Sequence, residues 1–492
     1  MLFNSVDYLL FFPIVSLLYF IIPKKLRNIW LLAASYFFYM NWNAKYALLL
    51  AFSTIVTYGC ALFIDHVPKE KKWIRRCGLW GCIFINLGLL FYFKYTNFII
   101  ENINRALRLL HQDGQLPLMD IVLPVGISFF IFQALGYTID VYRQSVKPTK
   151  NVFRYALFVS FFPQLVAGPI ERSANLLPQF EKTHTFDVER IRRGLLQMLW
   201  GLFMKIVIAD NLAGTVTMIY DNYGAYSGVE IVLATMMFAI QIYCDFGGYS
   251  NIAIGSAKVL GFTLMENFQS PYISESISEF WRRWHISLTK WFTDYVYIPL
   301  GGSRKGQIRT IVNTLIVFFV SGLWHGAQWT FIAWGVLNGI YLIAEKNTID
   351  VRRKLRQTLH IKEDTFSYHL WQRIYTFFWV SLSWMFFRAT GLKSVLLMLR
   401  QIVTRFEGHK LFGWTINNIG MEPQTLIVVL IAITLLFVVD DWKYKGNDAI
   451  AFVFRQGFVF RWCVYLGLLF TIIMFGAYGY EFTQTEFIYF QF

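Results

Sequence analysis

The stretch IRTIVNTLIVFFVSGLWHGAQWTFIAWGVLNGIYLIAE, residues 308–345, decides the fold of this chain. It holds two apolar runs with helical character, Ile311–Leu323 and Trp329–Ile343, and His325 lies between them. A titratable side chain at membrane depth costs several kcal/mol unless it is paired or faces a wet cavity, so it marks a functional site by default. The alternative is a buried histidine whose ring donates to a backbone carbonyl between two helices.

The composition of the whole chain is that of a membrane protein. Of 492 residues, 56% are hydrophobic, 19% are aromatic and only 15% are charged, whereas soluble domains carry about 25% charged residues. The net charge of +15 comes from short basic clusters between apolar runs, which is typical of the positive-inside bias and does not indicate nucleic-acid binding. The five cysteines show neither metal-ligand spacing nor a disulfide framework.

The apolar runs predict an all-α, polytopic bundle that forms one membrane domain over residues 1–492. Asp7–Ile22 is expected to be a mature helix and not a signal peptide, because no basic region precedes it. Lys24, Lys25 and Arg27 follow it, which places the N-terminus outside the cell. At about 20 residues per span we expect roughly eleven crossings, plus re-entrant and interfacial helices. Besides those named above, the predicted runs are Ile29–Met40, Tyr46–Ile64, Leu79–Ile100, Ile121–Ile139, Gly194–Ile219, Glu230–Tyr243, Trp371–Phe387, Leu426–Val439 and Trp462–Phe475.

The segment Tyr155–Ile170 breaks the alternation of inside and outside loops. It is apolar, contains Pro163, Gly168 and Pro169, and has basic segments on both sides. A segment that enters the membrane and returns to the same side accounts for this pattern, provided that its irregular backbone is buried in protein.

A second histidine lies in SISEFWRRWHISLTKWF, residues 276–292. Ser276 and Glu279 have capping-box spacing, so a helix is expected to begin there. The spacing then predicts one amphipathic helix against the membrane, with the face Trp281, Trp284, His285, Leu288 and Phe292. An ordinary interfacial anchor, in which His285 only hydrogen-bonds a neighbour, would have the same pattern.

Two further features bear on function. Gly322 and Gly326 flank His325 with GxxxG spacing, which predicts close approach of another helix backbone and a protein interior around the histidine. Asp245, at the end of an apolar run, is an intramembrane acid whose partner the sequence does not identify. The chain lacks the GxSxG, Walker, HExxH and CxxC motifs, so a histidine base acting on a hydroxyl of the substrate is favoured over those enzyme classes. A transporter without covalent chemistry is the rival hypothesis.

Several long motifs resemble the membrane-bound O-acyltransferase family, in the branch of alginate O-acetylation proteins and their peptidoglycan relatives. They follow one another along nearly the whole chain, and one departure is Asn251, where the family usually has an aspartate. The matching stretches are MLFNSVDYLLFFPIVSLLYF (1–20), FFPQLVAGPIERSANLLPQF (161–180), YCDFGGYSNIAIG (243–255), SISEFWRRWHISLTKWFTDYVYIPLGGSR (276–304), SGLWHGAQWTFIAWG (321–335) and FIYFQF (487–492).

The resemblance implies transfer of an acetyl group from a cytoplasmic donor for O-acetylation of a cell-surface polysaccharide. His325 matches the family's catalytic histidine, and His285 matches its second functional histidine. The donor would be acetyl-CoA or another acyl thioester, with no further cofactor and no metal. A separate extracytoplasmic acetyltransferase, membrane lipid and the glycan acceptor are the expected partners, in the cell (inner) membrane. D-alanyl transfer to teichoic acid is the alternative within the family.

The sequence also suggests residues that bind the substrate or the acyl donor. The expected set comes from the motifs around the two histidines and from YCDFGGYSNIAIG, and comprises Asp245, Tyr249, Trp284, Arg282, Arg283 and Trp324. Arg282 and Arg283, together with Arg304 and Lys305, could meet phosphates of the donor. For any single one of these cations, plain positive-inside topology is the favoured explanation.

Overall fold

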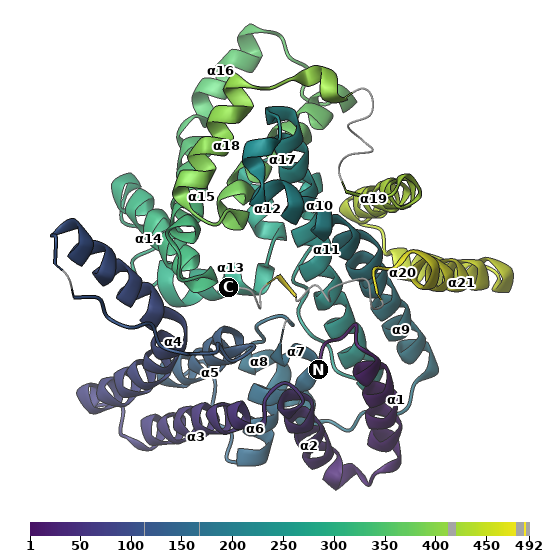
Figure 1. The fold of residues 1–492 in the computed structure, drawn as a ribbon. Coiled ribbons are helices and arrows are strands. Elements are labelled where there is room, and N and C mark those ends of the chain that lie inside the picture. The colour runs from purple at the N-terminus through teal and green to yellow at the C-terminus, as the bar shows by residue number, and fades with distance from the viewer. Residues whose placement is uncertain (113, 167, 412–419, 479–486, 489–492) are drawn as a thin grey trace. The chain divides into compact units, whose positions relative to one another are not determined.

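The computed structural model describes residues 1–112, 114–166, 168–411, 420–478 and 487–488, and every regular element in these ranges is a helix (Figure 1). The predicted all-α class is therefore confirmed. The chain divides into two compact units, Met1–Leu195 with Ala253–Met265 and Leu196–Ile252 with Glu266–Phe492. The prediction of one domain over the whole chain stays a prediction. Of the C-terminal motif FIYFQF, only Phe487 and Ile488 lie within the described residues.

The first unit holds the N-terminal helices and the irregular Pro-containing segment. Its elements are α1 (Val6–Ile21), η1 (Lys24–Leu26), α2 (Arg27–Met40), α3 (Ala44–His66), α4 (Lys72–Leu109), α5 (Ile127–Tyr142), α6 (Val152–Ser160), α7 (Phe162–Leu165), α8 (Ser173–Leu176) and η2 (Leu177–Glu181). Aromatic side chains fill its core: Phe162 lies against Phe11 and Phe38, with ring centroids 5.3 and 5.8 Å away.

The segment expected to be re-entrant is broken in the way its prolines and glycines suggest. It forms the two short helices α6 and α7 on either side of Phe161, and both are mostly buried. Gln133 and Gln164 both donate to the Phe158 carbonyl oxygen, at 2.5 and 2.7 Å, so side chains satisfy part of the irregular backbone. This agrees with the requirement that non-helical backbone at membrane depth be buried in protein. The return to the same side of a membrane stays a prediction.

The second unit holds both histidines of interest. Besides parts of α9 (Val188–Leu202) and α11 (Gly228–Leu260), which have residues in both units, its elements are η3 (a π-helical stretch, Phe203–Ala209), α10 (Asp210–Asp221), η4 (Tyr223–Ala225), η5 (Pro271–Ile273), α12 (Ile277–Arg283), α13 (Ile286–Phe292), η6 (Thr293–Tyr297), α14 (Gln307–His325), α15 (Trp329–Asn347), α16 (Ile349–Thr358), α17 (Phe366–Arg388), α18 (Leu392–Thr404), η7 (Gly408–Leu411), α19 (Pro423–Tyr444), α20 (Ala449–Arg455) and α21 (Phe458–Phe475).

One sequence prediction about helix boundaries is wrong. The run 276–292 is two helices, α12 and α13, and His285 stands between them with φ +43° and ψ +52°. The five residues of the predicted face therefore do not share one helix face. The predicted run Glu230–Tyr243 lies within α11, which continues past Asp245 through Gly247 and Gly248 to Leu260. Close backbone packing explains Gly248: a Cβ there would lie 2.7 Å from the Gly201 carbonyl oxygen.

The chain is a multi-pass membrane protein by the length and composition of its helices. Within the described residues, seven helical stretches are long and apolar enough to cross a bilayer, and α1 and α5 are shorter apolar helices. The seven are Ala44–His66, Lys72–Leu109, Val188–Asp221, Gly228–Leu260, Gln307–His325, Pro423–Tyr444 and Phe458–Phe475. The predicted runs in α2, α15 and α17 are also helical. The predicted number of roughly eleven crossings stays a prediction.

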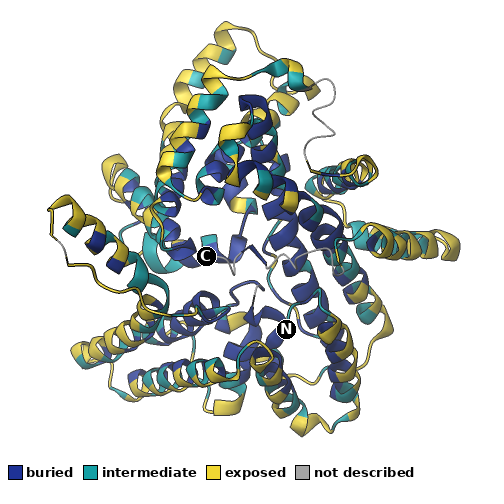
Figure 2. Cartoon of the chain, viewed as in Figure 1, coloured by how far each residue is buried: buried dark blue, intermediate teal, exposed yellow. Residues whose placement is uncertain are grey.

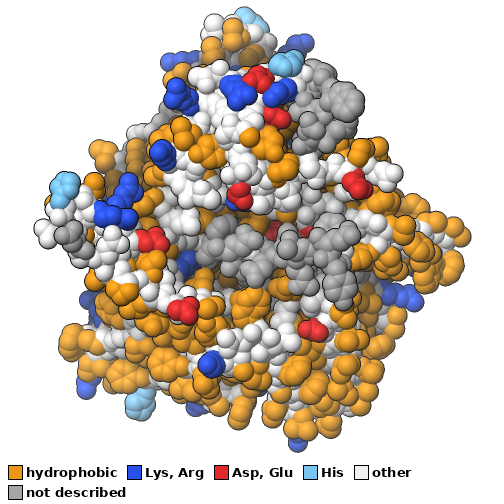
Figure 3. Space-filling model, in the orientation of Figure 1, with side chains coloured by type: hydrophobic (Ala, Val, Ile, Leu, Met, Phe, Trp, Pro, Cys, Tyr) orange, Lys and Arg blue, Asp and Glu red, His pale blue; other side chains and the backbone are white. Residues whose placement is uncertain are grey.

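Exposed apolar side chains agree with contact to lipid. In α21, Phe458, Val459 and Met474 are each about 70% exposed. Figure 2 shows α21 largely exposed where α11 is mostly buried, and Figure 3 shows hydrophobic side chains over much of the visible face. Soluble monomeric proteins rarely expose an apolar surface of this extent, whereas membrane proteins expose such a surface to lipid.

Candidate active site

The helical hairpin α14–α15 holds His325 in a tight protein interior, as the glycine spacing predicted. His325 is the last residue of α14 and is 4% exposed. A Cβ on Gly322 would lie 2.4 Å from the Phe331 carbonyl oxygen, and one on Gly335 would lie 2.2 Å from the Phe318 carbonyl oxygen. The two helices can approach this closely only because these positions carry no side chain.

Aromatic rings surround His325. Its ring centroid lies 4.9 Å from that of Trp334, 5.0 Å from Trp324 and 5.4 Å from Phe387, each nearly edge-on. Trp334 in turn stacks on Trp384 of α17, with centroids 5.5 Å apart. The imidazole therefore lies in a mainly aromatic surrounding at the end of its helix.

The structure brings His285 to the same place. The His285 and His325 ring centroids are 6.5 Å apart, and His285 also lies 6.0 Å from the Trp324 ring. His285 is 1% exposed and occupies the left-handed backbone region, which is uncommon for a residue other than glycine. A residue held in such a conformation between two short helices is often a functional one. The distance permits both imidazoles to reach one substrate.

Hydrogen bonds fix the tautomer of His285. Its Nδ1 lies 3.0 Å from Asn267 Oδ1, and the Ser287 hydroxyl donates to the same oxygen at 2.9 Å. The Ser287 backbone N–H also points to it, at 3.4 Å, and an N–H can only donate. The facing atom of Asn267 is therefore its oxygen, so Nδ1 of a neutral imidazole carries the proton and Nε2 carries the lone pair.

Burial keeps His285 neutral. It lies outside the candidate spans, and desolvation lowers the pKa of its imidazole from 6.5 to about 3. A base this weak is far from the pKa that suits proton abstraction near neutral pH. The geometry therefore suits His285 for accepting a hydrogen bond and orienting a substrate.

Asp245 belongs to a buried ion cluster. Lys205 Nζ lies 2.6 Å from Asp245 Oδ1 and 2.7 Å from Asp210 Oδ1, and all three side chains are at most 6% exposed. The Ile488 backbone N–H donates to Asp245 Oδ2 at 2.8 Å. Lys205 lies in the π-helical η3, and turns of this kind recur at functional sites. The sequence did not identify Lys205 as the partner, because it lies forty positions earlier in an apolar run.

The other expected binding residues separate into buried and surface groups. Tyr249 is buried, and its ring stacks on Phe487 at 4.5 Å; Trp284 packs on Trp384 at 5.0 Å. Arg283 pairs with Glu279 at 2.9 Å and covers the Tyr444 ring, whereas Arg282 is exposed. The structure thus brings Trp324, His285 and His325 together and does not bring the two arginines to them.

The carboxylates of Glu279 and Glu345 accept hydrogen bonds from backbone N–H groups at the start of helix α12. The Ser276 hydroxyl accepts from the Glu279 backbone N–H at 3.1 Å, so the predicted N-cap is confirmed. The reciprocal half of the capping box is absent among these contacts, because the Glu279 carboxylate accepts from the Glu275 backbone N–H instead. Glu345 of α15 also accepts from the Ile277 backbone N–H, at 2.7 Å. This bond connects the helix that leads to His285 with the hairpin that holds His325.

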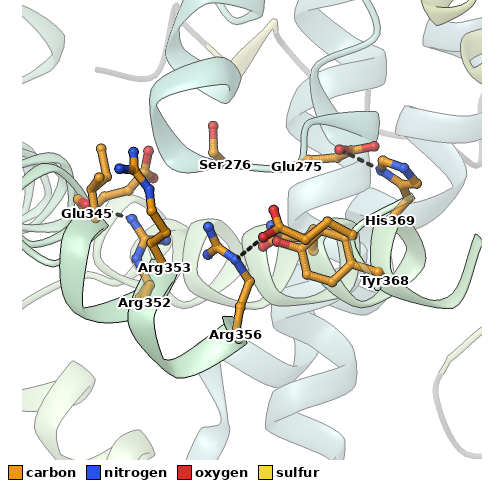
Figure 4. A pocket seen from close by; sticks show the side chains of 11 residues that line it. Glu275, Ser276, Glu345, Arg352, Arg353, Arg356, Tyr368 and His369 are labelled. Carbon is orange, nitrogen blue, oxygen red and sulfur yellow. Dashed lines mark hydrogen bonds and ion pairs between the residues drawn. The ribbon is translucent and has the colours of Figure 1, made fainter. Parts of the chain in front are cut away.

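A cleft of about 380 Å³ lies at the start of α12, between α15, α16 and α17 (Figure 4). Its charged side chains largely pair with one another: Arg356 with Glu363 at 2.9 Å and His369 with Glu275 at 3.0 Å. Arg352 donates to the Glu345 backbone carbonyl at 2.6 Å. Neither histidine of the pair lines this cleft, so it is a feature separate from the candidate active site.

No group of three or more His, Cys, Asp or Glu side chains among the described residues could hold a metal ion. What the site offers is acid–base chemistry. An imidazole such as that of His325, in this surrounding of aromatic rings, can move a proton to and from a hydroxyl or thiol group that a substrate brings.

Comparison with known proteins places this geometry in a family. Residues 141–391, which include both histidines, match the model of MBOAT, the membrane-bound O-acyltransferase family. The chain is 35% identical over 459 residues to a protein named probable alginate O-acetylase from Pseudomonas syringae pathovar tomato, covering 91% of this chain and 84% of that protein. It is 36% identical over 435 residues to the peptidoglycan O-acetyltransferase of Helicobacter pylori, covering 82% and 80%.

A more distant similarity covers the alternative considered from the sequence. The teichoic acid D-alanyltransferase of Streptococcus thermophilus is 27% identical over 253 residues, which is 47% of this chain and 60% of that protein. The longer and stronger similarities are to the O-acetylating proteins. This chain belongs to the membrane-bound O-acyltransferase family.

Proposed function

We propose that this protein transfers an acetyl group from a cytoplasmic acyl thioester across the cell membrane, for O-acetylation of a cell-surface polysaccharide. The observation that carries the proposal is the histidine pair: two buried imidazoles with centroids 6.5 Å apart, in a chain of this family. The relatives named for alginate and for peptidoglycan O-acetylation support a glycan as the final acceptor. A separate extracytoplasmic acetyltransferase that receives the acetyl group is part of the proposal.

His325 is the general base in this reaction. It takes the proton of the attacking hydroxyl while the oxygen forms a bond to the thioester carbonyl carbon, and it returns the proton to the leaving thiolate. Acid–base help of this kind contributes about 10²–10⁴-fold in rate. His285, whose pKa is too low for the same role, orients the substrate through the lone pair on Nε2.

The experiment measures ester on the cell surface. Cells that produce the wild-type protein or His325→Ala at equal protein level are treated with mild base, and the released acid is identified. We expect acetate from the wild type and its loss in the variant. Undiminished acetate from His325→Ala would overturn the catalytic assignment. Release of alanine would instead support D-alanyl transfer, and solute flux without any ester would support a transporter.

A further inference from the structure

A buried indole N–H next to His325 has no acceptor in the described part of the chain. Trp334 is 0% exposed, and its Nε1 is buried with no hydrogen-bond partner among the described residues. Its ring lies edge-on to the His325 ring, with centroids 4.9 Å apart and planes at 87°. Tryptophan Nε1–H can only donate, so an acceptor for it must have a lone pair.

Leaving such a donor unsatisfied is costly. A buried donor without an acceptor destabilises a protein by about 1–3 kcal/mol, and more than about 90% of buried polar groups in native structures are satisfied. Packing alone does not require the indole nitrogen, since Phe331 and Phe387 fill neighbouring parts of the same aromatic cluster with centroids 4.8 Å apart. The indoles of Trp281, Trp379 and Trp384 also lack an acceptor among the described residues, so the missing acceptor alone does not select Trp334. Of these four rings, that of Trp334 lies against the His325 ring, 4.9 Å away, and this position next to the proposed base favours an acceptor that the substrate supplies.

The ring of Trp334 is held in place from both sides. Trp384 of α17 stacks on it at 5.5 Å with planes 22° apart, and Phe387 lies edge-on at 5.2 Å. Trp334 also follows His325 by nine residues on the same hairpin. Next to it, the backbone of α15 at Gly335 packs closely against the Phe318 carbonyl oxygen of α14. The N–H direction is therefore fixed relative to the imidazole before a substrate arrives, as electrostatic stabilisation of a transition state requires.

We propose that the Trp334 Nε1–H donates a hydrogen bond to the carbonyl oxygen of the acyl group and stabilises the negative charge that develops on it. The proposal rests on the proposed function. The acceptor hydroxyl oxygen bonds to the carbonyl carbon, the C=O electron pair moves to the oxygen that Trp334 binds, and His325 takes the hydroxyl proton. The tetrahedral intermediate then collapses, the C–S bond breaks, and the thiolate leaves with the proton from His325.

The test removes the N–H and keeps the ring. Trp334→benzothienylalanine, introduced by stop-codon suppression, replaces the indole N–H with sulfur in a bicyclic ring of nearly the same shape. Trp334→Phe is the second variant, for the case that the first is poorly produced. The readout is the initial rate of base-labile acetate accumulation on cells at equal protein level. We expect a loss of about 10²–10³-fold, the usual effect of removing one donor to an oxyanion.

Trp379 provides a matched control. Its Nε1 is also buried without an acceptor among the described residues, but its ring packs on Tyr341, Tyr375 and Phe378, away from the histidine pair. Trp379→benzothienylalanine should keep the wild-type rate. A Trp334→benzothienylalanine rate within about threefold of wild type would overturn the inference. The rate of His325→Ala in the same assay separates the two proposals. If His325→Ala is inactive, a near-wild-type rate of Trp334→benzothienylalanine refutes the role of Trp334 alone. If His325→Ala is active, the proposed function fails.

Discussion

The two histidines have different neighbours and hydrogen-bond partners although their ring centroids lie only 6.5 Å apart. His285 is fixed by Asn267 and Ser287 and kept neutral by burial, whereas His325 ends a membrane helix among aromatic rings. Two titratable groups whose surroundings differ in this way can divide the work of one reaction between them. The division assigned above gives proton transfer to His325 and orientation to His285.

The low pKa of His285 predicts how stability depends on pH. The folded protein binds a proton at His285 only near pH 3, whereas the unfolded chain binds it near 6.5. The unfolded state is therefore stabilised as pH falls below 6.5, by at most about 1.4 kcal/mol per pH unit. His325 is the titratable ring that faces this group. The thermal unfolding midpoint of detergent-solubilised protein should fall less steeply with pH in His285→Gln than in the wild type. Equal slopes in the two proteins between pH 6.5 and 4.5 would contradict the assignment.

The ion cluster of Lys205, Asp210 and Asp245 predicts a second residue-level effect. Lys205→Met leaves two carboxylates buried without their cation and should destabilise the protein by about 3–5 kcal/mol. Adding Asp210→Asn and Asp245→Asn to Lys205→Met removes both charges and should restore most of the loss. Urea or thermal unfolding of the two variants measures this. A triple variant no more stable than Lys205→Met would show that the charges do not cause the effect.

The sequence identified only some of the residues in the candidate site. His325 could be selected because it is a titratable group between two apolar runs, and His285 because it lies among aromatic residues and matches the second functional histidine of the family. Lys205 could not be assigned to Asp245, since their pairing depends on how α11 packs against η3. Trp334 was not selected either, because one tryptophan among seventeen carries no signal until its neighbours and its unsatisfied nitrogen are known.

At the scale of elements, the hairpin α14–α15 is the part of the site that depends most on backbone contact. Gly322 and Gly335 let the two helices approach until main-chain atoms touch. The GxxxG spacing predicted the close approach correctly at Gly322, because close helix contact requires small residues. Its second glycine, Gly326, lies past the end of α14 and meets the Phe331 side chain, and Gly335 was not selected from the sequence. The break at His285 was not predictable in the same way. The i, i+3, i+4 pattern runs through it without interruption, and the extended backbone of Trp284 and the left-handed backbone of His285 separate α12 from α13.

The hairpin predicts the effect of one added methyl group. Gly335→Ala places a Cβ 2.2 Å from the Phe318 carbonyl oxygen, so α14 and α15 must separate. We expect a loss of about 1–3 kcal/mol in stability, and reduced acyl transfer because Trp334 and His325 shift apart. Gly214→Ala in α10 is the control, since nothing lies within 4 Å of its Cβ, and alanine favours a helix by about 1 kcal/mol. Equal unfolding midpoints for the two variants would contradict close packing of the hairpin.

At the scale of the molecule, composition and charge alternation indicated the membrane fold, because apolar helices and basic loops leave a strong sequence signal. The number of crossings is harder to predict from the sequence. Short apolar helices such as α2 and interrupted ones such as α6 and α7 resemble membrane-spanning helices in composition. Crossing number follows from tertiary packing and from where the bilayer lies.

The basic loops predict the topology. With the N-terminus outside, residues 67–71 lie in the cytoplasm and the loop at 222–227 lies outside. After replacement of the native cysteines, Lys71→Cys in intact cells should resist a membrane-impermeant maleimide, and Gly224→Cys should react with it. Permeabilised cells are the control, in which both should react. The reverse pattern in intact cells would invert the proposed orientation and place the donor on the wrong side.

The central claim is that His285 and His325 serve one reaction, and a double-mutant cycle tests it most directly. The initial rate of surface acetylation is measured at equal protein level for His285→Ala, His325→Ala and the double variant. When two groups act as a unit, the rate losses from removing each one do not multiply. After background subtraction, the double variant should therefore have the same rate as the slower of the two single variants. Losses that multiply, or an undiminished rate in His325→Ala, would contradict the claim that the two imidazoles act together on one acyl transfer.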